Sequence, residues 1–133
     1  MKYLIDTNIC VYFLRGKFNL DSIFKKTGLS NLYISEITAF ELSYGAELSD
    51  NKEKSQNQVK KFLSGISILP IYSTLDLYAS EKVRLRKAGK PVHDEFDFLI
   101  ALTAIQNDLI MVTDNVKDFI NLENIKLENW INR

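Results

Sequence analysis

The stretch Met1-Lys2-Tyr3-Leu4-Ile5-Asp6-Thr7-Asn8 decides the fold expected for this chain. Its first five residues form a short, mostly apolar run, which is typical of a buried strand. Asp6 follows that run directly. Because a buried, isolated carboxylate is costly or becomes neutral, an acid in such a place usually has a cation or another partner. We therefore interpret Asp6 as a functional residue.

Two further acids occur in apolar surroundings. Glu41 lies beside Phe40 and Leu42, in a segment that is predicted to be the end of a strand followed by a helix. Asp97 lies in the run Phe96-Asp97-Phe98-Leu99-Ile100 of the most apolar predicted helix. Three such acids on separate elements suggest a shared divalent cation. Oxygen ligands favour Mg²⁺ or Mn²⁺. One His and one Cys, far apart in the sequence, cannot make a zinc site.

Short apolar runs alternate with amphipathic stretches along the chain, which favours a parallel sheet flanked by helices. The predicted strands are Lys2–Ile5, Leu32–Ile34, Ser67–Ile71, Leu109–Thr113 and a weaker Lys126–Glu128. The predicted helices are Thr7–Leu14, Leu20–Lys26, one capped by Ser35 and running to Ala46, one opening at Ser49-Asp50, one from Thr74 to Gly89 with Leu75, Tyr78, Val83 and Leu85 turned inward, and Glu95–Asn107. No repeat or linker interrupts residues 1–133, so we expect one domain.

Sheets of this kind bind ligands at the carboxyl ends of their strands. Asp6 follows the first strand and Thr113-Asp114-Asn115 follows the fourth. If these two strands are neighbours, both segments lie on one edge of the sheet. Glu41 and Asp97, each early in a helix, can point to the same place.

Composition narrows the class of protein. Of 133 residues, 46% are hydrophobic and 26% charged, which is ordinary for a soluble globular domain. The single cysteine, Cys10, lies among apolar residues and excludes an internal disulfide, and no apolar run approaches the length of a membrane span. We therefore expect a cytoplasmic location and no membrane partner. Neither GxxxxGK[ST] nor GxGxxG occurs, and a single imidazole, His93, makes a serine or cysteine triad a poor hypothesis.

The 17 basic residues balance the 17 acidic ones, so only a local patch could attract nucleic acid. Such a patch is the run Glu81–Lys90, which carries five cations. Lys82, Arg86 and Lys90 share one helical face if the helix reaches Lys90. This row is either a solvated face or a surface that binds RNA phosphates.

Four motifs together resemble the PIN domain, in particular the VapC-type toxins of bacterial toxin–antitoxin pairs. They are Leu4-Ile5-Asp6-Thr7-Asn8, Phe40-Glu41-Leu42-Ser43-Tyr44-Gly45, Asp97-Phe98-Leu99-Ile100-Ala101 and Val112-Thr113-Asp114-Asn115-Val116-Lys117-Asp118-Phe119. The resemblance spans essentially the whole chain. It implies a PIN-like three-layer α/β/α fold with a central parallel sheet flanked by helices.

The resemblance also implies a function. PIN-domain toxins are Mg²⁺- or Mn²⁺-dependent endoribonucleases that cleave tRNA, rRNA or mRNA, block translation, usually form homodimers and are neutralised by a cognate antitoxin. Carried over by position, the metal ligands would be Asp6, Asp97 and Glu41. The fourth catalytic acid would be Asp118, with Asp114 as the alternative. Thr7, Thr113 and Asn115 would position the substrate or the carboxylates. The loop before Asp97 is longer than usual, so Asp94 could compete with Asp97.

Other functions stay open at this point. A receiver-like signalling domain would need an acceptor Asp after the third strand and a Lys after the last core strand, and the chain has neither there. A PIN-fold nuclease acting on DNA fits the same acids. A catalytically silent binding module is the third alternative, and a metal-dependent activity assay separates it from the other two.

Overall fold

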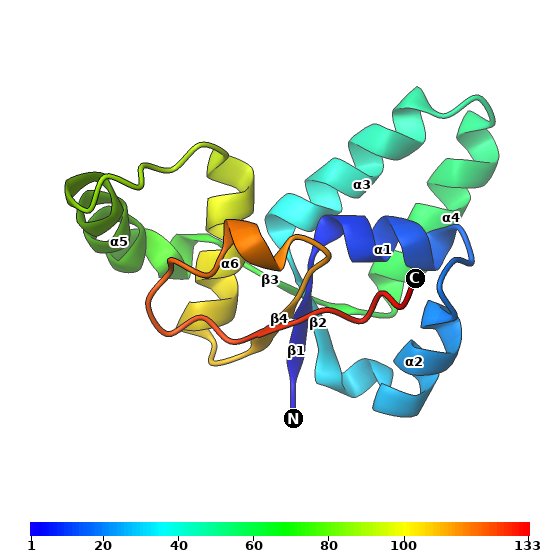
Figure 1. The fold of residues 1–133 in the computed structure, drawn as a ribbon. Helices are drawn as coiled ribbons and strands as arrows, with labels where there is room; N and C mark the ends of the chain where they lie inside the picture. Colours follow the sequence, from blue (N-terminus) through cyan, green and yellow to red (C-terminus); the bar gives the residue numbers. More distant parts are fainter.

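The computed structural model describes all 133 residues. A five-stranded, wholly parallel sheet lies at its centre, with strand order β3-β2-β1-β4-β5 (Figure 1). The strands are β1 (Tyr3–Ile5), β2 (Leu32–Ser35), β3 (Ser67–Leu69), β4 (Ile110–Val112) and β5 (Leu127–Glu128). The helices are α1 (Thr7–Leu14), α2 (Leu20–Thr27), α3 (Glu36–Leu48), α4 (Lys52–Ser64), α5 (Leu75–Lys87) and α6 (Glu95–Gln106), with short 3-10 helices η1 (Leu29–Asn31), η2 (Tyr72–Thr74) and η3 (Val116–Asp118).

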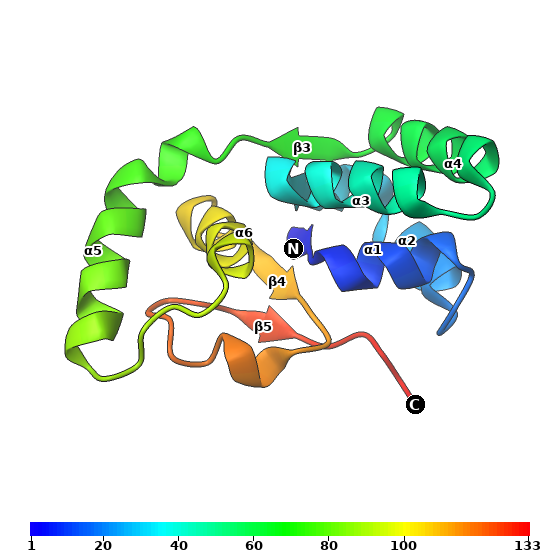
Figure 2. The ribbon, with the colours of Figure 1, turned by 90° about the horizontal axis from the view of Figure 1, so that it is seen from above.

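Two hydrophobic cores make the fold three-layered. One core joins the sheet to α1–α4 and includes Ile5 and Val112; the other joins it to α5 and α6 and includes Leu4 and Met111. Successive residues of a strand point to opposite faces, so each central strand contributes to both cores. Figure 2 shows the resulting arrangement, with α1–α4 on one side and α5 and α6 on the other. The predicted PIN-like α/β/α fold is confirmed.

The topology creates a switch point at β1. The chain proceeds outward from β1 through β2 to β3, and then returns to the other side of β1 as β4. Ile5 is in register with Val112, so the next residues, Asp6 and Thr113, are neighbours. The prediction that these two segments share one edge is therefore confirmed.

Helix ends follow the local signals. Gly28, with φ +90°, ends α2, and Gly89, with φ +74°, follows the end of α5. Only glycine adopts such backbone angles readily. The limits of the predicted elements agree with the observed ones to within about a turn. None of the helices combines the length and apolar character needed to cross a membrane.

One prediction about α5 was wrong. Leu75 and Val83 were expected to face inward, yet 58% and 51% of their surfaces are exposed. The helix lies at the edge of the molecule and packs on α6 through one narrow stripe, which includes Leu85 and Tyr78. A helix that contacts the rest of the protein on one side only buries fewer of its apolar residues than its sequence suggests.

Candidate active site at the carboxyl ends of the strands

Asp6 is fixed at the start of α1. One carboxylate oxygen, Oδ1, accepts a hydrogen bond from the backbone N–H of Thr7 at 2.8 Å, and Oδ2 accepts one from Thr113 Oγ1 at 2.8 Å. The side chain is 4% exposed. Burial raises the pKa of Asp6 even though both hydrogen bonds lower it. The carboxylate is therefore held rigidly, and no cationic side chain is hydrogen-bonded to it.

Thr7 links the first acid to the second. Its hydroxyl donates to Glu41 Oε1 at 2.6 Å and lies 2.9 Å from Thr38 Oγ1. A hydroxyl has one proton, so Thr38 is the donor in the second contact. Thr38 is fully buried and was missed in the sequence. Its spacing of one helical turn before Glu41, on a helix capped by Ser35, was the available signal.

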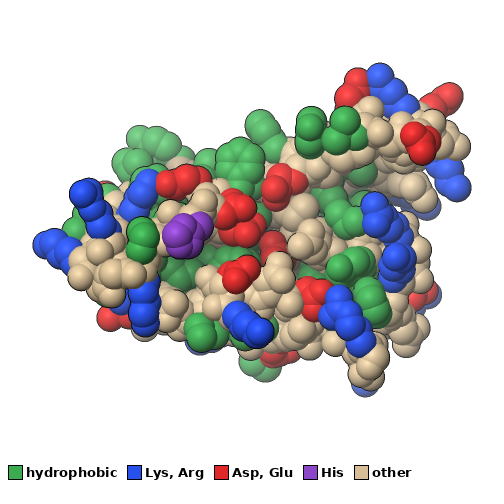
Figure 3. All heavy atoms as spheres, turned by 45° about the horizontal axis from the view of Figure 1, so that its top comes forward, with side chains coloured by type: hydrophobic (Ala, Val, Ile, Leu, Met, Phe, Trp, Pro, Cys, Tyr) green, Lys and Arg blue, Asp and Glu red, His purple; other side chains and the backbone are tan.

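Asp97 lies in the first turn of α6. The N-cap of this helix is Asp94, whose Oδ1 accepts a hydrogen bond from the backbone N–H of Asp97 at 3.0 Å. Burial raises the pKa of Asp97 to about 7, and the negative charges of Asp6, Asp94, Glu41 and Asp118 add to that increase. These five carboxylates therefore lie near one another. Figure 3 shows acidic side chains gathered near the centre of one face of the molecule.

Asp114 and Asp118 have different surroundings. Arg133 donates two hydrogen bonds to the Asp114 carboxylate, at 2.9 and 2.7 Å, and lowers the pKa of Asp114. Asp118 is exposed in η3, and its charge contributes to the raised pKa of Asp97. Of these two acids, Asp118 is therefore the one that acts on the acidic cluster and has no ion pair with a cationic side chain.

Thr113 and Asn115 also lie at this edge of the sheet. Thr113 is fully buried, donates to Asp6 and accepts a hydrogen bond from the backbone N–H of Asn115 at 3.1 Å. The side chain of Asn115 is exposed and forms no hydrogen bond. Its role in positioning substrate stays a prediction, whereas Thr113 directly orients Asp6.

The donor set fits a hard divalent cation. The cluster supplies carboxylate oxygens, with the hydroxyls of Thr7 and Thr113 hydrogen-bonded to them. Burial first, and neighbouring carboxylates second, raise the pKa values of Asp6 and Asp97. No three acidic, His or Cys side chains lie close enough together to enclose an ion directly. The ligand set of Asp6, Asp97 and Glu41 therefore stays a prediction. Mg²⁺ is commonly bound by one or two carboxylates, with water completing the shell.

The prediction that Lys82, Arg86 and Lys90 form one row on α5 is wrong in part. The helix ends at Lys87, and the left-handed Gly89 turns the chain, so Lys90 lies off the helix and donates to Asn121 Oδ1 at 3.2 Å. Lys82 forms an ion pair with Glu95, which raises the pKa of Lys82. Of these three cations, only Arg86 is exposed and without a hydrogen bond or ion pair. The row assumed one more helical turn than the chain makes.

Comparison with known proteins agrees with this geometry. The family model described as "PIN domain" matches residues 3–124. The chain belongs to the PIN domain family. It is 35% identical to "Ribonuclease VapC2" of Rickettsia felis and 30% identical to "tRNA(fMet)-specific endonuclease VapC" of Shigella flexneri, with 98% of both chains covered in each comparison.

A solved structure extends the likeness to three dimensions. The DNA-bound VapBC of Salmonella typhimurium contains a chain with a TM-score of 0.88 and 30% identity, and 98% of each chain is covered. The match extends over the full sheet and both helical layers. This PIN domain is therefore of the VapC type.

Proposed function

We propose that this PIN-domain chain is a metal-dependent endoribonuclease toxin that cleaves tRNA, rRNA or mRNA in the cytoplasm and so inhibits translation. The observation that carries the proposal is the set of uncompensated carboxylates around Asp97, whose pKa is raised to about 7. Such a cluster destabilises the protein unless a cation binds to it. The names of the two VapC relatives support ribonuclease activity as the use of that cation.

The proposed reaction is hydrolysis of a phosphodiester bond. A bound Mg²⁺ or Mn²⁺ would stabilise charge on the phosphate oxygens and lower the pKa of a coordinated water. Asp6 and Asp97 would hold the ion. Glu41 and Asp118 would complete its shell through water or accept a proton from the attacking water.

The hydroxyl groups would keep this arrangement in place. Thr113 holds one oxygen of Asp6, and the Thr7 hydroxyl holds one oxygen of Glu41. Both oxygens of Asp6 thus accept a hydrogen bond from the protein, and each retains a lone pair for a cation, whereas Glu41 keeps its second oxygen free of protein hydrogen bonds. Fixed donors of this kind reduce the reorganisation needed in the transition state.

A cognate antitoxin and a second copy of the chain are the proposed protein partners. The Salmonella relative was crystallised as VapBC, which supports an antitoxin. For the dimer, α3 carries an outward stripe of Phe40, Tyr44 and Leu48, which are 74%, 67% and 66% exposed. Hydrophobic side chains line the upper edge of the molecule in Figure 3, above the acidic cluster. An exposed apolar patch marks an interaction site, and Tyr44→Glu should convert a dimer into a monomer in light scattering.

The central test combines growth with cleavage in vitro. Induction of the wild-type chain should arrest growth, and the purified protein should cleave RNA in Mg²⁺ or Mn²⁺ but not in EDTA. Asp6→Asn should abolish both effects, whereas Asp76→Asn, an equal charge change at an exposed position of α5, should abolish neither. Cleavage of single-stranded DNA instead of RNA would favour a DNA nuclease. Normal growth and no cleavage by the folded wild type would indicate a silent binding module.

A further inference from the structure

A cavity of about 520 Å³ is continuous with the acidic cluster. Asp94, Asp97 and Asp118 line it, together with the loop between α5 and α6 and the segment 117–122. Of the residues that line the cavity, the reaction proposed above uses only Asp97 and Asp118. The rest of the cavity therefore needs another explanation, and its size is that of sites that bind small molecules.

The cavity has an apolar interior and a polar rim. Its apolar lining residues are Leu85, Phe98, Phe119 and Leu122, each at most 8% exposed, and the half-buried Val92. Its exposed polar lining residues are Lys90, His93, Lys117 and Asn121. Such a lining matches a nucleoside, which has apolar faces, polar edges and an attached phosphate that lysines attract.

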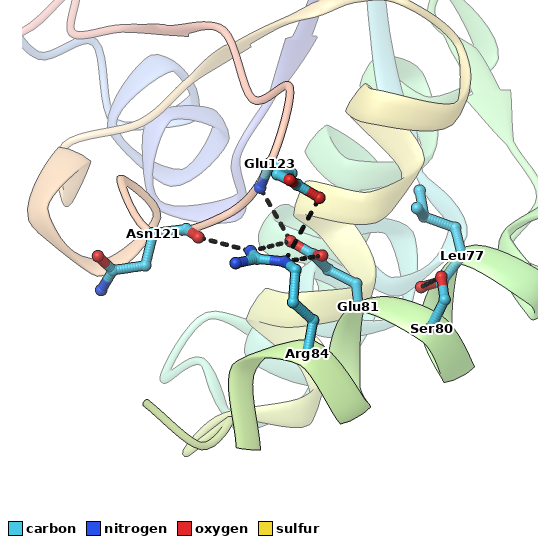
Figure 4. Close-up of polar contacts among 6 residues, drawn as sticks. All are labelled: Leu77, Ser80, Glu81, Arg84, Asn121 and Glu123. Atoms are coloured by element: carbon cyan, nitrogen blue, oxygen red, sulfur yellow. Dashed lines mark hydrogen bonds and ion pairs between the residues drawn. The ribbon is translucent and has the colours of Figure 1, made fainter. Parts of the chain in front are cut away.

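The wall of the cavity is held in place by an ion pair between the half-buried Arg84 and the buried Glu81 (Figure 4). Arg84 donates to both oxygens of Glu81, at 2.6 and 2.7 Å, and to the backbone carbonyl of Asn121 at 2.8 Å. Glu81 in turn accepts a hydrogen bond from the backbone N–H of Glu123 at 2.9 Å. The segment 121–123 is thus tied to α5, so the cavity is formed before any ligand binds.

We propose that this cavity binds the base and ribose of one unpaired nucleotide next to the scissile phosphate, with a neighbouring phosphate at Lys90 or Lys117. The inference rests on the proposed ribonuclease function and adds the feature that selects the cleavage position. A base inserted there would lie beside the carboxylates that hold the cation. Unpaired nucleotides are the usual targets of sequence-specific RNA recognition, because their bases can leave the stack.

Binding of the four nucleoside 5′-monophosphates tests the cavity without catalysis. Each is titrated into the Asp6→Asn protein in EDTA and followed by methyl NMR signals. At least one should shift the signals of Leu85 and Leu122. Val92→Phe, which fills the cavity, should weaken that binding by roughly tenfold or more. Val83→Phe is the matched control, because Val83 is exposed on α5 and does not line the cavity. Absence of any shift, or equal binding by both variants, would overturn the proposal.

Cleavage preference separates this proposal from the proposed function. Short single-stranded RNAs that differ only at the two nucleotides flanking the cut are cleaved by the wild type and by Val92→Phe. If Val92→Phe does not fold, the smaller change Val92→Met replaces it, because Val92 is only half-buried. We expect the preference at one flanking position to be lost while Mn²⁺ still stabilises the variant.

Each other outcome has a definite meaning. An unchanged preference in a protein that cleaves RNA would overturn the cavity alone. Monophosphate binding by a protein that cleaves no RNA would leave the cavity and overturn the ribonuclease. Weakened antitoxin binding with an unchanged preference would assign the cavity to a protein segment and contradict the proposal.

Discussion

The acidic cluster and helix α5 carry similar numbers of charges but neutralise them differently. On α5, Arg84 pairs with Glu81 and Lys82 with Glu95, and these contacts lower the pKa of each carboxyl group. In the cluster, burial and neighbouring carboxylates raise the pKa of Asp6 and Asp97 instead. Paired charges stabilise the fold, whereas unpaired charges of one sign need a ligand. The difference indicates where function resides.

The sharpest test of this comparison is between two acids on one segment. Asp118→Asn should lower RNA cleavage by roughly 10- to 100-fold, because it removes a carboxylate that acts on the cluster. Asp114→Asn should leave cleavage within about twofold and slightly lower the melting temperature, because Arg133 already neutralises Asp114. Initial cleavage rates in Mn²⁺ measure both. Equal losses in the two variants would contradict the assignment of the fourth acid.

The pH dependence of stability gives the second test. The folded-state pKa of Asp97 is about 7, above its ordinary 3.8, so the folded protein binds more protons than the unfolded chain between these values. Stability without metal should therefore fall as pH rises from about 4 to 7 and then level off. The raised pKa of Asp6 acts in the same direction. Asp97→Asn should flatten the profile of melting temperature against pH in EDTA. A profile as steep as that of the wild type would refute the raised pKa.

A third prediction concerns the paired charges of α5. Arg84→Met should lower the melting temperature by about 5 °C, because it leaves the buried carboxylate of Glu81 without its cation. Arg86→Met, two residues away on the same helix, should change it by less than about 1 °C, because Arg86 has no partner. Thermal unfolding followed by circular dichroism measures both. Similar values for the two would show that the ion pair has no special structural role.

The smallest expected effect is on RNA binding. Lys90→Gln should reduce the slope of log affinity against log salt by roughly 0.7, the value for one lost contact to a single strand. Lys82→Gln should leave the slope unchanged, because its ammonium group is already paired with Glu95. Fluorescence anisotropy in the catalytically inactive Asp6→Asn background measures the slopes. A larger change for Lys82 than for Lys90 would restore the helical row as the RNA surface.

The fold was predictable from the sequence because its signals are local. Short apolar runs identified the strands, and the position of Asp6 directly after β1 needed only the register of β1 with β4 to bring it to Thr113. The contacts that distinguish similar residues are not local. The ion pair between Asp114 and Arg133 depends on the path of the C-terminal segment, which no periodic pattern encodes.

The same limit applies to the partners of Glu41. Its hydrogen bond joins residues 34 positions apart, and the buried Thr38 beside it became visible only with the packing of α1 on α3. The aromatic neighbours of Glu41 suggested a buried setting, yet Phe40 and Tyr44 are exposed. Which face of an apolar helix is covered depends on the neighbouring elements, or on a partner chain.

Metal binding tests most directly whether the acidic cluster requires a cation. At pH 8, where Asp97 is ionised, Mn²⁺ should raise the melting temperature of the wild type by several degrees, since a ligand at roughly a hundred times its Kd stabilises the native state by about 2.7 kcal/mol. The control Asp76→Asn/Asp114→Asn, which removes two acids outside the cluster, should show the same increase. Asp6→Asn/Asp97→Asn should be more stable than the wild type without metal and should show no increase. An unchanged response to Mn²⁺ in this double variant would contradict the account.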